Sequence, residues 1–120
     1  MAQRGARFDH VRIVWSRQRA GFDPGRSRGW IDWDNILLID VREPKETAQE
    51  RIAGAVLAPL SQFDPVNLPD PHGRTVVFTC GSGVRSMKAA EIAQAAGLAY
   101  DAHLAGGLKA WKAAGLPTET

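Results

Sequence analysis

The chain has very little cysteine, because Cys80 is the only one among 120 residues. A single thiol excludes an internal disulfide and a zinc site built on paired cysteines. Since free thiols persist in reducing compartments, we expect a cytoplasmic protein. The chain also lacks an apolar run of the roughly 18 residues that a membrane span needs. Its first residues contain no apolar stretch of a secretory signal. We therefore expect no membrane association.

The composition is typical of a soluble globular domain, with 44% hydrophobic and 23% charged residues. Positive charge gathers at the start, where residues 1–28 hold seven arginines against two aspartates. We predict an Arg-rich N-terminal arm over residues 1–33, with no firm structure assigned, and one folded domain over residues 34–120. No nucleic-acid-binding motif accompanies the arginines, so we expect no nucleic-acid partner. The oligomeric state stays open.

Alternating strand and helix patterns indicate the fold class. Apolar runs predict strands at 35–41 and 75–80, a weaker one at 98–104 and a very short one within 54–60, and they leave a strand at 10–15 open. Helical patterns cover 43–51, 87–97 and 107–115. The order predicts an α/β fold with a small parallel β-sheet flanked by helices on both faces. Ligands of such sheets bind beyond the carboxyl ends of the strands. Two polar clusters follow predicted strands there, DVRE (40–43) and CGSGVRS (80–86).

The loop after the second predicted strand suits a reactive thiol. A strand that enters a helix through a glycine-rich turn directs several backbone N–H groups at one point. Gly81 and Gly83 permit that close approach of the backbone. We expect Cys80 at the mouth of the resulting concavity, poorly placed for core packing, with its pKa lowered by the amides and by Arg85. These are the requirements of an activated nucleophile.

Three stretches between about Asn35 and Pro117 resemble the rhodanese (sulfurtransferase) family. LLIDVREPKE resembles the family's first signature, CGSGVRS its active-site loop with cysteine first and arginine sixth, and HLAGGLKAWKAAGLP its closing stretch. The resemblance implies a rhodanese-like fold. It also implies that Cys80 takes a sulfane sulfur from a donor such as thiosulfate, holds it as a persulfide, and passes it to cyanide or a thiol.

The same resemblance implies roles for the neighbours of Cys80. The residues expected to surround the persulfide are those of the loop: Gly81, Ser82, Gly83, Val84, Arg85 and Ser86. Asp40 and Arg42 match the family's acidic residue and arginine, and we expect an ion-pair network with Glu46 that holds the sheet edge. No metal or organic cofactor is implied. The partners would be small sulfur compounds or a sulfur-relay protein.

Other residues depart from the family pattern or carry weaker signals. ERIAGA (50–55) stands where the family usually has a glycine-histidine-isoleucine-proline motif, so Arg51 replaces the histidine and the local turn is left open. The histidines His10, His72 and His103 show no metal-ligand spacing. None is placed by the sequence as a base for Cys80, and we expect His103 to be structural.

Three alternative functions remain. A cysteine-dependent phosphatase uses a similar loop, but with five residues between cysteine and arginine, whereas four separate Cys80 from Arg85. GSGVRS (81–86) also resembles a dinucleotide motif, which lacks its third glycine here. The third alternative is an inactive rhodanese-like module that only binds partners, because a fold does not determine a function.

Overall fold

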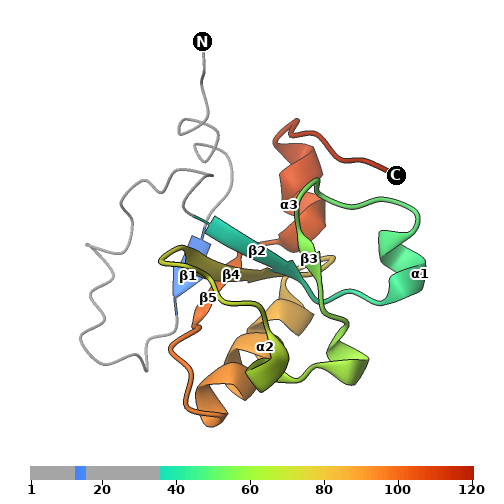
Figure 1. Cartoon of the computed structure of the whole chain (residues 1–120). Helices are drawn as coiled ribbons and strands as arrows, with labels where there is room; N and C mark the ends of the chain where they lie inside the picture. The colour runs from blue at the N-terminus through green and yellow to red at the C-terminus, as the bar shows by residue number, and fades with distance from the viewer. Residues whose placement is uncertain (1–12, 16–35) are drawn as a thin grey trace.

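One five-stranded sheet organises the part of the chain that the structure, a computed structural model, describes: residues 13–15 and 36–120. The strand order is β1-β5-β4-β2-β3, with bounds β1 Ile13–Trp15, β2 Ile36–Asp40, β3 Val56–Leu57, β4 Thr75–Thr79 and β5 Ala102–Leu104 (Figure 1). The four strands from β5 to β3 run parallel, as predicted. β1 pairs antiparallel with β5 at one edge.

The strand at 10–15 that the sequence left open is thus β1, within the predicted arm. The rest of that arm, and the predicted division at residue 33, lie outside the described residues, so the division stays a prediction.

Helices cover both faces of the sheet, which confirms the predicted fold class. The helices are α1 (Pro44–Thr47), α2 (Val84–Ala95) and α3 (Gly107–Ala113), with 3-10 turns η4 (Leu60–Gln62) and η5 (Pro65–Asn67). α2 and α3 lie on opposite sides of the sheet (Figure 1). In the described ranges, no helix is long and apolar enough to cross a bilayer.

Helices α1 and α2 and strand β5 differ most from their predicted bounds. α2 begins at Val84, before the predicted 87–97 pattern, because Gly83 adopts a left-handed conformation that turns the chain into the helix. α1 is a single turn, closed by a capping box between Glu43 and Glu46, rather than a helix over 43–51. β5 covers only the end of the predicted 98–104 strand.

The core divides into two layers because successive strand residues point to opposite faces. One layer lies on the α3 side and comprises Ile36, Leu38, Ile52, Val77, Ala102, Leu104 and Trp111. The other lies on the α2 side and comprises Leu37, Ile39, Val41, Val76, Phe78, Cys80, Ala89, Ala90 and Ala93. Since Phe78 pairs in register with His103, both residues face α2.

Candidate functional site

The two predicted polar clusters lie side by side at the carboxyl ends of β2 and β4. Asp40 ends β2 and pairs in register with Thr79, which ends β4 immediately before Cys80. The pairing continues past the strands, since the Val41 amide donates to the Thr79 carbonyl at 2.9 Å. This arrangement places the Asp40 segment beside the Cys80 loop.

Backbone amides are directed at the sulfur of Cys80. The Gly83 amide donates to Sγ at 3.0 Å, and the thiol lies 3.6 Å from Ser86 Oγ, to which it donates. Gly83 reaches this position with φ of 106°, a left-handed conformation that favours glycine. Burial raises the pKa of the Cys80 thiol, but hydrogen bonds from Ser86, Gly83 and Ser82 lower it, so that the net pKa lies below the usual value. The loop therefore makes the thiolate easier to form, and this pKa shift has the direction that the sequence predicted.

The expectation that Cys80 is poorly placed for core packing is wrong. The residue is only 1% exposed and belongs to the core layer on the α2 side. The reason is its register: Cys80 points to the same face as Phe78, where the small side chains Ala89 and Ala90 of α2 leave room for a thiol. Cys80 is at once a packed core residue and the acceptor of the amide hydrogen bond.

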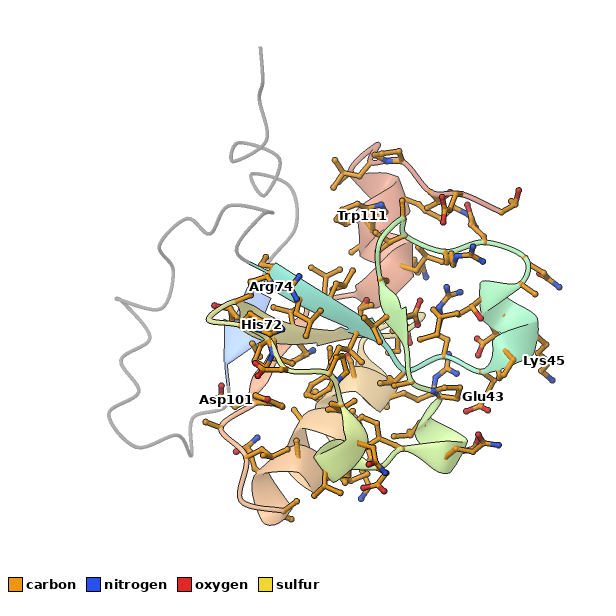
Figure 2. The ribbon with its side chains drawn as sticks, viewed as in Figure 1. Glu43, Lys45, His72, Arg74, Asp101 and Trp111 are labelled. Atoms are coloured by element: carbon orange, nitrogen blue, oxygen red, sulfur yellow. The ribbon has the colours of Figure 1, made fainter. Side chains whose placement is uncertain are left out.

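Arg85 has a hydrogen-bonded partner that the sequence did not predict. Its guanidinium forms two hydrogen bonds to Glu46 of α1, Nη1 to Oε1 at 2.7 Å and Nη2 to Oε2 at 2.9 Å. This pairing with Arg85 is the largest cause that lowers the pKa of Glu46 to about 2. The Cys80 thiol owes its lowered pKa to the hydrogen bonds of the loop. Arg85 thus joins the loop to α1, whose position the labels Glu43 and Lys45 mark in Figure 2.

Asp40 and Arg42 form a buried ion pair of their own. Arg42 donates from Nε and Nη2 to the Asp40 carboxylate, with the shortest contact at 2.9 Å. The Arg42 side chain is 5% exposed and the Asp40 side chain 2% exposed. Arg42 Nη2 also donates to the Glu50 carbonyl at 2.7 Å. This contact ties the end of β2 to the segment after α1, and the charge of Arg42 also helps to lower the pKa of Glu46.

The first turn of α3 supports the Cys80 loop from the other face. The Leu108 amide donates to the Cys80 carbonyl at 2.7 Å, and the Lys109 amide donates to the Gly81 carbonyl at 3.0 Å. A Cβ at Gly107, where φ is +57°, would overlap the Cys80 carbonyl. Trp111, on the same helix, packs in the core layer of this face (Figure 2). The sequence did not predict this contact of α3 with the loop.

His103 is the site residue that sequence reasoning missed. Its Nδ1 lies 3.3 Å from Ser86 Oγ, the same oxygen that Cys80 contacts. Burial lowers the pKa of the half-buried imidazole. The pairing of His103 with Phe78 places it on the Cys80 face, and this register could not be read from the sequence.

The structure accounts for Arg51. Arg51 and Glu119 exchange backbone hydrogen bonds of 2.8 and 2.7 Å, and Arg51 Nε lies 3.2 Å from Glu119 Oε2. The C-terminal tail accordingly runs toward α1 (Figure 1). The turn that follows is closed by a hydrogen bond from the Ala55 amide to the Ile52 carbonyl, with Gly54 at φ of 84°. Arg51 therefore holds the C-terminal segment against this turn.

Comparison with known proteins agrees with this geometry. The family model of the rhodanese-like domain matches residues 24–114. A protein from Synechocystis without an assigned function is 47% identical over 85 residues, covering 71% of this chain and 48% of that protein. A protein from Allochromatium vinosum named sulfurtransferase is 37% identical over 92 residues, covering 76% of this chain and 85% of that protein. The chain thus spans about half of the first relative and most of the second.

Two solved structures are similar in both fold and sequence. A rhodanese-related protein from Thermoplasma volcanium has a TM-score of 0.62 at 27% identity, covering 72% of this chain and 85% of that one. A Rhodopseudomonas palustris protein described as a possible tyrosine phosphatase has a TM-score of 0.59 at 30% identity, covering 71% of each chain.

Proposed function

Because the chain belongs to the rhodanese-like domain family, we propose that it is a sulfurtransferase in which Cys80 carries the transferred sulfur as a persulfide. The observation that carries the proposal is the hydrogen bond from the Gly83 amide to Cys80 Sγ at 3.0 Å, within a loop that lowers the thiol pKa. A thiolate held by amides is an activated sulfur nucleophile. The sulfurtransferase name of the Allochromatium relative supports the reaction class.

The reaction consists of two transfers. The Cys80 thiolate attacks the outer sulfur of thiosulfate, a new S–S bond forms, and sulfite leaves with the electron pair of the broken bond. Cyanide or a thiolate then attacks the outer sulfur of the persulfide, and Cys80 leaves again as the thiolate. A persulfide donor enters the same way and releases its own thiolate.

Different residues serve this chemistry in different ways. The amides of Gly81 to Ser86 are the donors proposed to surround the persulfide. Asp40 and Arg42 support the position of the loop, because their buried ion pair lies beside it. Glu46 compensates the charge of Arg85, so the loop offers little net positive charge to the thiosulfate dianion. A thiol persulfide, either free or on a sulfur-relay protein in a reducing cytoplasm, is then as good a donor as thiosulfate.

Intact-mass measurement tests the proposal. After incubation with thiosulfate, and separately with glutathione persulfide, the chain should gain one sulfur atom that cyanide removes as thiocyanate. Cys80→Ser should gain none. If the serine variant gained the same mass, or the parent chain gained none from either donor, the proposal would be wrong.

Phosphatase activity is the second candidate, because the Rhodopseudomonas neighbour is described as a possible tyrosine phosphatase. Phosphate binding would need the guanidinium of Arg85, which Glu46 engages at both Nη atoms. An aryl phosphate assay separates the two: phosphate release without sulfur loading would favour the phosphatase.

The burial of Cys80 favours a third candidate, a partner-binding module without activity. Such a module would fail both the loading and the phosphatase assays while remaining folded.

A further inference from the structure

Three polar side chains from separate elements lie beneath the Cys80 loop, each in contact with the next. Cys80 follows β4, Ser86 lies in the first turn of α2, and His103 lies in β5. Ser86 Oγ lies 3.6 Å from Cys80 Sγ and 3.3 Å from His103 Nδ1. Ser86 is 0% exposed and Cys80 is 1% exposed, so water does not easily replace either contact.

Ser86 has two acceptors for its single hydroxyl proton. One is the Gly83 carbonyl at 3.2 Å, and the other is His103 Nδ1. A carbonyl accepts a hydrogen bond but is not protonated at ordinary pH, whereas a neutral imidazole is a base that can be protonated. Of the two, only His103 can remove a proton from the buried pair of Cys80 and Ser86.

We propose that His103 is a positioning residue for Cys80. His103 accepts the Ser86 hydroxyl proton at Nδ1, and Ser86 in turn accepts the proton of the Cys80 thiol. In this step the S–H bond of Cys80 breaks as an O–H bond forms on Ser86. The original O–H bond of Ser86 breaks as an N–H bond forms on His103. The products are a thiolate and an imidazolium, joined by the Ser86 hydroxyl, and no electrons leave the system.

The resulting arrangement leaves the thiolate well satisfied. Sγ keeps the hydrogen bond from the Gly83 amide and gains a donor in the Ser86 hydroxyl. Burial lowers the pKa of His103, so the imidazole takes up a proton less readily before the thiolate forms. The negative charge that forms on Cys80 then favours the imidazolium, because opposite charges attract strongly in a buried site.

Charged groups also lie near Cys80, Ser86 and His103. The pairing with Glu46 of α1 raises the pKa of Arg85, and the charge of Cys80 also raises it. Asp101, which is buried, is the acidic residue nearest to His103 along the chain. Burial is the cause of the lowered His103 pKa. The negative charge that forms on Cys80 is therefore the change that we expect to raise the pKa of His103 during the transfer.

The ultraviolet absorbance of the thiolate tests the proposal without requiring any reagent to reach the buried sulfur. Cys80 is the only cysteine, so the difference from Cys80→Ser reports this thiolate alone. In His103→Asn, the amide keeps a polar atom near the Nδ1 position but cannot take up a proton. We expect the midpoint of thiolate formation to rise by about one pH unit, a tenfold change, as for loss of one hydrogen bond to a charged group. Absorbance well above both midpoints should be unchanged.

A double-mutant cycle separates this role from a structural one. Ser86→Ala should also raise the midpoint, and adding His103→Asn to it should produce no further shift, because His103 acts through the hydroxyl. His72→Asn is the matched control: this exposed histidine lies before the amino end of β4, at the other end of that strand from Cys80 (Figure 2). Its midpoint should equal that of the parent chain.

Two results would overturn the proposal: an unchanged midpoint in His103→Asn, or a full additional shift when the change is added to Ser86→Ala. Circular dichroism checks that each variant is folded, and His103→Gln replaces His103→Asn if the latter is not. The inference rests on the proposed function only in taking Cys80 as the reacting group. Sulfur loading without the midpoint shift would refute the relay alone, and a shift without loading would refute the proposed function alone.

Discussion

Arg85 and Glu46 form a two-point ion pair that joins the Cys80 loop to helix α1 across 39 positions of sequence. Glu46 also accepts the Glu43 amide at 2.9 Å, within the capping box that closes α1. One carboxylate therefore holds both the start of α1 and the arginine of the loop. Loss of this carboxylate should loosen both segments together.

Glu46→Gln should lower the free energy of unfolding by about 1 kcal/mol at pH 7. The side chains of Arg85 and Glu46 are 35% and 33% exposed, so solvent screens their ion pair. Since the pKa of Glu46 is lowered from 4.5 to about 2, its stabilising contribution is complete above pH 4.5 and is lost as the pH falls toward 2. Urea unfolding at several pH values measures it. Glu91→Gln, at an exposed position of α2, should change little, and an equal loss there would contradict the prediction.

Gly107→Ala should destabilise the chain by about 3 kcal/mol and reduce sulfur loading of Cys80, because the new Cβ overlaps the Cys80 carbonyl. Gly97→Ala is the matched control, since Gly97 has φ of +89° with no atom within 4 Å of a built Cβ. That variant should lose only about 1 kcal/mol from backbone strain. Urea unfolding compares the two. Equal losses would show that the contact with the loop has no consequence.

Asp40→Asn should cost about 3 to 5 kcal/mol, because it leaves the buried charge of Arg42 without its partner. The double change Asp40→Leu with Arg42→Met removes both charges and should cost less than the single change. Thermal unfolding measures both variants. If the single and double variants were equally unstable, packing rather than the unpaired charge would be the cause.

Stability should rise with pH because of Cys80. The thiol pKa is lowered in the folded chain by the loop hydrogen bonds. The stabilisation is therefore absent below the folded pKa, grows as the pH rises through it, and is complete above the unfolded value of about 8.5. The difference in unfolding free energy between the parent chain and Cys80→Ser, measured from pH 6 to about pH 9.5, should grow over this range. A constant or shrinking difference would contradict the lowered pKa.

The sequence by itself determined the features that depend on neighbouring residues. Apolar runs bounded by turn residues indicated β2 and β4, and the glycine-rich segment after β4 indicated a tight entry into a helix. Such patterns are local, because side-chain period and backbone conformation depend on a few adjacent residues. These patterns sufficed to predict the α/β class and the hydrogen bonding of a backbone amide to Cys80.

Only the tertiary structure decided which side chains meet. The burial of Cys80, the pairing of Arg85 with Glu46 and the approach of His103 to Ser86 all depend on contacts between separate elements. Strand register chooses the face on which a side chain lies, and a shift of one residue would move it to the opposite face. Packing of helices on that sheet then selects the partners. Neither is written in the spacing of neighbouring residues, because both depend on segments that folding brings together from distant parts of the chain.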